Sequence, residues 1–197
     1  KWTATVRDLP KYAAGQEISY SWTEGEMPEG YSLTGTSKEG TVTTLTNSYT
    51  PEKTEATVQE TKIMNSLNQG IYACETSNPC LKACEIYEHF DDGICVDDQA
   101  SGTYTNCHIH DNKENGIYIS DSSTPSFEDC KIHDNETEGE NCPGVTVENS
   151  SNQSLKDCEI YGHLGNGICV KDQASGTYKN CYLHNNIDGN FNNETSN

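Results

Sequence analysis

The sequence repeats itself about every 23 residues, and this period constrains the fold more than any other feature. One cysteine in each unit precedes a triplet such as "EIY", and these cysteines are 23, 23, 28 and 23 residues apart. One glycine in each unit precedes a triplet such as "ICV", and these glycines recur at the same steps. The cysteines are Cys84, Cys107, Cys130, Cys158 and Cys181, and the glycines are Gly70, Gly93, Gly116, Gly144 and Gly167. Two markers with one period, including the same longer step, indicate a solenoid of stacked units.

Two stretches of this repeat are nearly the same. The segments "KACEIYEHFDDGICVDDQASGTYTNC" (82–107) and "KDCEIYGHLGNGICVKDQASGTYKNC" (156–181) share 19 of 26 positions at an offset of 74 residues. That offset equals three repeat units, so the near-copy is a higher-order repeat of the shorter unit.

Each unit contains short runs in which apolar and polar residues alternate, as in Ile117-x-Ile119. Period two predicts strands with one buried face, and clusters of Gly, Asn, Asp and Ser between the runs predict turns. If each strand pairs in parallel with its equivalent in the next coil, identical positions lie about 4.8 Å apart along one axis. This arrangement suits a chain with only 32% hydrophobic residues, because a narrow coil needs few of them.

Units such as "NCHIHDNKENGIYIS" (106–120) resemble the right-handed parallel β-helix repeats of the pectin-lyase-like superfamily. We therefore predict an all-β chain whose residues 68–197 form a right-handed parallel β-helix of about five to six coils. Residues 51–67 are predicted to be a linker, and residues 1–50 a separate, partial β-sandwich module.

The first 50 residues resemble the C-terminal half of the Cna B-type domain, a β-sandwich stalk module of Gram-positive surface adhesins. The matching residues are Trp2, "LPKY" (9–12), Gly15, Ile18, Tyr20, Glu24, Pro28, "GY" (30–31) and "TNSY" (46–49). In that family a Lys on the first strand forms an isopeptide bond with an Asn on the last strand, assisted by a buried Glu. The resemblance places the Glu at Glu24 and the Asn at Asn47, and the Lys-bearing strand would lie before residue 1.

The five repeating cysteines are predicted to form an inward column of reduced thiols that pack as small hydrophobes. Parallel in-register neighbours are farther apart than the Cβ separation of about 3.8 Å that a disulfide requires. Cys74 and Cys80 lie outside the column and could pair locally. We see no CxxC motif or compact Cys/His group, which argues against a zinc site. A second column, Tyr87, His110, His133, Tyr161 and His184, is interpreted as a stack of rings because Tyr alternates with His.

The candidate binding residues are acidic. Asp98, Asp121 and Asp172 follow the apolar markers at a fixed interval, and carboxylates on neighbouring rungs suit Ca²⁺, here at Asp98 and Asp121. Carboxylates about 5 Å apart would also suit a retaining glycosidase. The strongest break in the repeat is the insertion 136–143, whose candidates are Glu136, Glu138 and Glu140. Apart from Ca²⁺, the sequence indicates no cofactor, and no residue is assigned a catalytic role on a substrate.

The charge narrows the range of functions. Lys and Arg number 12 against 31 Asp and Glu, a net charge of −19, which disfavours nucleic acid and anionic membranes as partners. No apolar run is long enough to span a membrane. The β-helix lyases use a cationic base, commonly Arg, and Arg7 in the front module is the only arginine.

Two hypotheses follow. The favoured one is a non-catalytic structural or adhesive segment of a cell-surface or secreted protein from a Gram-positive-type bacterium. An extracellular glycan or a host surface would be its partner. The alternative is a carbohydrate-active β-helix enzyme, either a polysaccharide lyase or a glycoside hydrolase.

Overall fold

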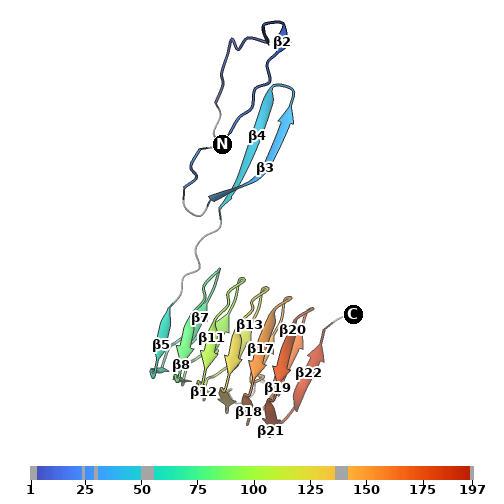
Figure 1. Ribbon diagram of the computed structural model, residues 1–197. Coiled ribbons are helices and arrows are strands. Elements are labelled where there is room, and N and C mark those ends of the chain that lie inside the picture. The colour runs from blue at the N-terminus through green and yellow to red at the C-terminus, as the bar shows by residue number, and fades with distance from the viewer. Residues whose placement is uncertain (1–3, 24, 29–30, 50–55, 136–141, 196–197) are drawn as a thin grey trace. The chain divides into compact units, whose positions relative to one another are not determined.

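The computed structural model describes residues 4–23, 25–28, 31–49, 56–135 and 142–195, and within these ranges it contains β-strands and turns but no helix (Figure 1). The chain divides into two compact units, residues 1–52 and 53–197. The second unit is a solenoid with three parallel sheets of six strands each. The predicted parallel β-helix is therefore confirmed.

The strands of each sheet follow one another along the solenoid axis. The first sheet consists of β7 (Ile71–Ala73), β10 (Ile94–Val96), β13 (Ile117–Ile119), β16 (Val145–Val147), β19 (Asn166–Lys171) and β22 (Gly189–Glu194). The second consists of β5 (Thr57–Gln59), β8 (Cys80–Lys82), β11 (Thr103–Thr105), β14 (Ser126–Glu128), β17 (Asn152–Lys156) and β20 (Ser175–Lys179). The third consists of β6 (Lys62–Met64), β9 (Glu85–Tyr87), β12 (His108–His110), β15 (Lys131–His133), β18 (Glu159–Tyr161) and β21 (Tyr182–His184).

Equivalent residues of successive coils lie in register. Ile94 pairs with Ile117 in the first sheet, Tyr104 with Phe127 in the second, and Ile109 with Ile132 in the third. All of these side chains point inward and are fully buried. The rings of Tyr104 and Phe127 stack with centroids 4.5 Å apart. A single column of like side chains thus forms the core on each side of the coil.

The corner between the second and third sheets is made by one residue in the left-handed region. This corner column is Glu60, Ala83, Asn106, Asp129, Asp157 and Asn180, with φ between 47° and 55°. The left-handed region is uncommon for residues other than Gly, and Asn and Asp tolerate it best because their short polar side chains bond locally. The left-handed backbone of this turn therefore explains why most coils have Asp or Asn there.

A column of buried polar residues lies in the turns that connect each third-sheet strand to the first-sheet strand that follows it. Its members are His89, Asn112, Asn135, His163 and Asn186. Asn112 donates from Nδ2 to Asn135 Oδ1 at 2.7 Å and to the Ile86 carbonyl at 3.3 Å. This column explains the repeating glycines. A Cβ built on Gly93 would lie 2.7 Å from Asn112 Nδ2 and 2.6 Å from Ile109 Cγ2, closer than side-chain packing allows.

The front unit contains two antiparallel pairs, β1 (Tyr12–Ala13) with β2 (Gln16–Glu17) and β3 (Tyr31–Glu39) with β4 (Val42–Tyr49). These strands fit the predicted partial β-sandwich, and no described residue of this unit is buried. Asn47 lies on β4 opposite Leu33 and is exposed. Glu24, the acid expected from the resemblance to assist isopeptide formation, lies outside the described residues. The segment 51–67 contributes β5 and β6, the first strands of two solenoid sheets.

Candidate functional site

The third sheet presents regular columns of mostly polar and aromatic side chains, and we call its outward surface the ladder face. Each of its six strands directs two side chains outward. The first outward column is Lys62, Glu85, His108, Lys131, Glu159 and Tyr182, and the second is Met64, Tyr87, His110, His133, Tyr161 and His184. Parallel in-register pairing places the members of each column one rung apart, about 4.8 Å.

One group of side chains on this face occurs twice. Glu85 accepts from Lys62 Nζ at 2.6 Å through Oε2, and its Oε1 lies 3.3 Å from His110 Nε2. Three rungs farther along, Glu159 Oε2 lies 3.2 Å from Lys131 Nζ and its Oε1 lies 3.3 Å from His184 Nε2. Each carboxylate is therefore held between a lysine and an imidazole in the same way.

The second column forms a continuous stack of rings, as the alternation of Tyr and His predicts. Tyr87, His110, His133, Tyr161 and His184 have successive centroids 5.1, 5.0, 4.8 and 4.9 Å apart with interplanar angles of 7° or less. The Nδ1 atoms of His110 and His133 each contact a following aspartate, Asp111 at 2.7 Å and Asp134 at 2.9 Å. Because the ring faces are covered by one another, only ring edges and polar tips meet the solvent.

The ionisation of the ladder face follows from these contacts. Hydrogen bonding from Lys62 lowers the pKa of Glu85, and hydrogen bonding from His184 lowers that of Glu159. The same bond to Glu85 raises the pKa of Lys62. Partial burial, and then the charge of Lys131, lowers the pKa of His108. At neutral pH the face therefore carries paired Lys and Glu charges together with a neutral His108.

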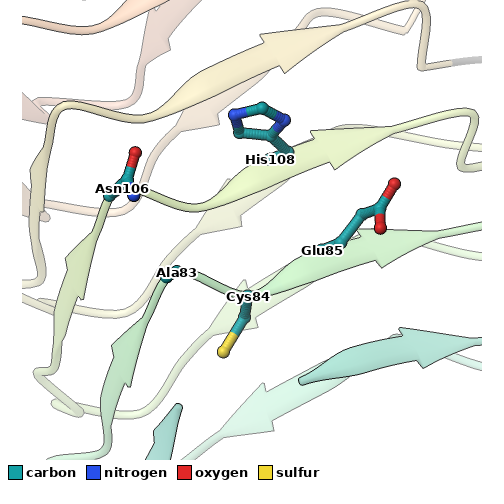
Figure 2. Close-up of a pocket in the computed structure, with 5 residues that line it drawn as sticks. All are labelled: Ala83, Cys84, Glu85, Asn106 and His108. Carbon is teal, nitrogen blue, oxygen red and sulfur yellow. The ribbon is translucent and has the colours of Figure 1, made fainter. Parts of the chain in front are cut away.

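A shallow open hollow of about 280 Å³ lies on the ladder face at its edge with the corner column. It is lined by Ala83, Cys84, Glu85, Asn106 and His108. Figure 2 shows the imidazole of His108 and the amide of Asn106 on the same side, whereas the sulfur of Cys84 points the other way, toward the inside of the coil. The polar groups that meet a ligand here are therefore the amide, the imidazole and the carboxylate.

A cluster of acidic side chains lies in the turns that precede the first-sheet strands β10 and β13. Asp91, Asp92 and Glu114 bring ligand atoms within 4.8 Å of one another. Asp92 is only 5% exposed, and its Oδ1 accepts from the backbone N–H of Asn115 at 3.0 Å and from Asn115 Nδ2 at 2.8 Å. Burial raises the pKa of Asp92 to about 7. Asp92 is thus part of a partly buried chain of hydrogen bonds that continues from Asn115 to Thr146.

The structure places the three predicted binding aspartates in exposed turns. Asp98, Asp121 and Asp172 all have left-handed φ angles of 47° to 50°. Asp121 Oδ1 accepts from Asn149 Nδ2 at 2.9 Å, and Asn149 is its equivalent one rung on. Within the described residues, the three-carboxylate group is the Asp92 cluster and does not include these turns. The other predicted binding residues, Glu136, Glu138 and Glu140, lie outside the described residues.

The thiols of the repeating cysteines lie in one inward column. Cys84, Cys107, Cys130 and Cys158 are buried, Cys181 is half-buried, and all five are free thiols. Their Sγ atoms contact backbone carbonyls, such as Thr105 O at 3.5 Å from Cys107 and Tyr104 O at 3.4 Å from Cys130. The column therefore packs and bonds within the core.

The ladder face and the hollow were not among the sites predicted from sequence, although both leave a sequence signal. The strand triplets read KIM, EIY, HIH, KIH, EIY and YLH, so Lys and Glu recur every third coil. The residue before each repeating cysteine is Asn or Asp in four coils and Ala only at Ala83. Ala83, at a position where the later coils have Asn or Asp, is the sequence signal that would have located the hollow.

Three parallel sheets, left-handed corners and buried columns define this unit as a parallel β-helix. The comparisons agree: residues 44–197 match the right handed beta helix region family, and the chain belongs to that family. Residues 1–48 match the Cna protein B-type domain. No curated protein matches the chain.

Among solved structures, the crystal structure of pectate lyase Pel9A is similar, with a TM-score of 0.50 and 14% sequence identity. The likeness covers 62% of this chain and 38% of the pectate lyase chain. At that identity it supports the fold alone. Both matched families are typical of extracellular or surface proteins. No helix among the described residues is long and apolar enough to cross a membrane.

Proposed function

We propose that this chain is a non-catalytic structural and adhesive segment of a bacterial cell-surface protein, of Gram-positive type, that binds an extended glycan along its ladder face. The observation that carries the proposal is the duplicated group of Lys, Glu, His and Tyr. In both copies the glutamate lies 3.3 Å from the imidazole of the next rung, and the lysine of the preceding rung lies 2.6 Å from it in one copy and 3.2 Å in the other. Carboxylate, ammonium and imidazole groups can together donate to and accept from sugar hydroxyls.

The spacing of the two groups suits a polymer. They are three rungs apart, about 14 Å at 4.8 Å per rung. A linear chain laid along the axis would contact both groups at once, and simultaneous contact increases the apparent affinity through effective concentration. With a net charge of −19, the protein favours a neutral chain over a polyanionic one.

The test is a glycan array with and without EDTA, followed by titration of bound oligosaccharides of increasing length. Glu85→Gln and Glu159→Gln should each weaken binding of chains that span both groups roughly tenfold or more. Binding of fragments that reach only one group should change about twofold. The melting temperature should shift by less than about 2 °C, because exposed ion pairs contribute little stability.

Glu128→Gln is the matched control. Glu128 also contacts a lysine, Lys156, but it lies on the second sheet, away from the ladder face. Its substitution should leave glycan binding unchanged. Equal losses from Glu128→Gln and Glu85→Gln, or no bound glycan at all, would refute the proposed function.

One observation favours the second candidate, a carbohydrate-active enzyme. Asp92, with its pKa raised to about 7, lies beside Asp91 and Glu114, and a protonated acid beside a carboxylate is the pairing that glycoside hydrolysis requires. Against it, Asp92 is buried, and its Oδ1 already accepts two hydrogen bonds from Asn115. Release of reducing ends or unsaturated uronides from polysaccharides, lost in Asp92→Asn, would establish the enzyme and overturn the non-catalytic proposal.

A further inference from the structure

The hollow on the ladder face exists because the corner column is interrupted. Asn106, Asp129, Asp157 and Asn180 fill this corner in later coils, whereas Ala83 occupies it in the second coil with φ 52°. Alanine gains no local hydrogen bond in the left-handed region, so it carries backbone strain that Asn or Asp would reduce. Departures from the local rule of a repeat are expected at functional positions.

The space left by the missing side chain is lined by polar groups. Asn106 and His108 are exposed and lie on one side of the hollow, and Glu85 is half-buried on the adjacent strand (Figure 2). The Ala83 N–H is already used, since it donates to the Thr105 carbonyl at 2.9 Å. The N–H groups of Asn106 and His108 likewise donate to the carbonyls of Glu128 and Cys84, so we assign recognition to side chains.

These side chains suit uncharged hydroxyl groups. The Asn106 amide both donates and accepts, Glu85 accepts, and a neutral imidazole at His108 does one of each. The nearby lysine, Lys62, is held by Glu85 at 2.6 Å, so its charge is already balanced. Because the Lys62–Glu85 pair carries no net charge, it offers a polyanionic sugar no net attraction.

The size of the hollow limits what it can hold. A volume of about 280 Å³ is just below the range of about 300–1,000 Å³ typical of sites for whole drug-sized ligands. It suits one ring of a longer chain whose other rings lie along the sheet. We propose that the hollow at Ala83 is the principal subsite of the ladder face and binds one residue of a neutral glycan chain through Asn106, His108 and Glu85. This inference rests on the proposed function, and it specifies the ligand class and the subsite.

The near-copy of this segment provides an internal control. Asp157 occupies the position equivalent to Ala83, and its neighbours Glu159 and Tyr161 match Glu85 and Tyr87. Asp157 Oδ1 accepts from Asn180 Nδ2 at 3.0 Å, so the corner is filled there. The two corners differ in the side chain that opens or closes the hollow.

The experiment uses the full chain and two reciprocal variants, Ala83→Asn and Asp157→Ala. The probes are hexasaccharides of β-1,4-linked glucose, mannose and galactose, with hexagalacturonate as the anionic comparison, titrated by calorimetry. Ala83→Asn should weaken binding of the neutral hexasaccharide at least tenfold while raising the melting temperature by roughly 2–4 °C. Asp157→Ala should lower the melting temperature by a similar amount and keep the affinity within about twofold of the parent.

The outcomes separate the two proposals. If the parent binds a neutral hexasaccharide and Ala83→Asn binds it equally well, the subsite is wrong and the ladder face stands. If hexagalacturonate binds more tightly than the neutral chains, the ligand class is wrong. If the parent binds none of the probes and no glycan on the array, the proposed function fails and the subsite with it. The rise in stability shows that a loss of binding in Ala83→Asn does not come from unfolding.

Discussion

Residues 82–107 and 156–181 build two coil segments with the same fold and different surfaces. Every apolar side chain that the first copy buries in the core has the identical residue in the second. The seven differing pairs are 83/157, 88/162, 90/164, 91/165, 92/166, 97/171 and 105/179, and they lie at corners, in turns or on an outward strand position. The inward columns therefore determine the coil, and the outward positions differ while the coil stays the same.

The differences change the charge of the two copies. At the seven positions the first copy carries four acidic residues and no basic one, whereas the second carries one acidic residue and two lysines. The Asp92 cluster and the hollow at Ala83 both belong to the first copy. The ladder-face residues Glu85 and Tyr87 are shared with the second copy as Glu159 and Tyr161. The shared face and the unshared hollow can thus be tested separately.

The largest effect should come from a position that both copies share, the glycine before the first-sheet strand. In Gly93→Ala the new Cβ would lie 2.6 Å from Ile109 Cγ2, 2.7 Å from Asn112 Nδ2 and 2.7 Å from the Gly116 carbonyl. We expect a loss of about 3 kcal/mol in the free energy of unfolding, measured by urea denaturation.

Gly167→Ala sharpens this comparison. Its Cβ would meet Asn186 Nδ2 and the Asn190 carbonyl at 2.7 Å but no core methyl group within the three nearest atoms. The loss should therefore be smaller. Equal stability of Gly93→Ala and the parent would contradict the buried polar column as the reason for glycine.

The next effect concerns Asp92, the one differing position at which the first copy buries its side chain, which is Asn166 in the second copy. Its pKa is raised from 3.8 to about 7 by burial, so the folded state holds the proton more tightly than the unfolded state. Stability from this group is present below about pH 4 and is lost as the pH rises to about 7.

Asp92→Asn removes that loss while keeping the acceptor oxygen for Asn115. The full displacement of the pKa corresponds to an upper limit of about 4 kcal/mol, and relaxation around a buried charge reduces it. We expect the variant to gain about 2 kcal/mol at pH 8 and nothing at pH 4, measured by denaturation at both values. A gain that is independent of pH would show that ionisation is not its cause.

Sequence reasoning succeeds where one physical requirement repeats in every coil. The steps between cysteines and between glycines specify the register, because one column must stack and the other must leave room for Asn112 and its equivalents. The ring stack followed from the same logic. Local pattern also predicted Asp98 and Asp121 as binding residues, although their left-handed backbone already accounts for Asp at these turns.

The hollow and the Asp92 cluster escaped sequence reasoning for a different reason. Both depend on which turn residues of separate coils face one another, and a period alone does not state this. Asp92 and Glu114 are 22 residues apart in sequence and meet only because successive turns stack. Ala83 is an unremarkable residue until its column is aligned with Asp157.

The third prediction concerns the two histidines that both copies place in the buried polar column, where the other coils have Asn. His163 is fully buried with ring nitrogens 3.3 Å from two backbone carbonyls, those of Asn135 and Ile132. Burial lowers its pKa below 6.5. The unfolded state therefore binds protons more readily, and this contribution to stability is lost as the pH falls below about 6.5.

His163→Asn should remove that pH dependence. Relative to the parent, the variant should gain about 1 kcal/mol between pH 7 and pH 5.5, measured as the difference between two denaturation series. His89→Asn is the counterpart in the first copy, and burial lowers the pKa of His89 as well. A difference between variant and parent that stays constant over this range would contradict a neutral, buried His163.

The smallest effect should come from exchanging an outward residue that differs between the copies. Thr105 lies on β11 between Lys82 on one neighbouring strand and Glu128 on the other, and its equivalent in the second copy is Lys179. In Thr105→Lys the new ammonium group would share Glu128 with Lys156 on one side and meet Lys82 on the other. The two contributions nearly cancel at this outward, half-buried position, so the free energy of unfolding should change by less than about 0.5 kcal/mol. Thermal denaturation at low and at high salt separates the charge-dependent effect of the substitution from the effect that remains when charges are screened. At high salt charge repulsion is screened. A loss above about 1 kcal/mol under that condition would show that outward positions also determine the coil. The two copies would then not be interchangeable, although their buried residues are the same.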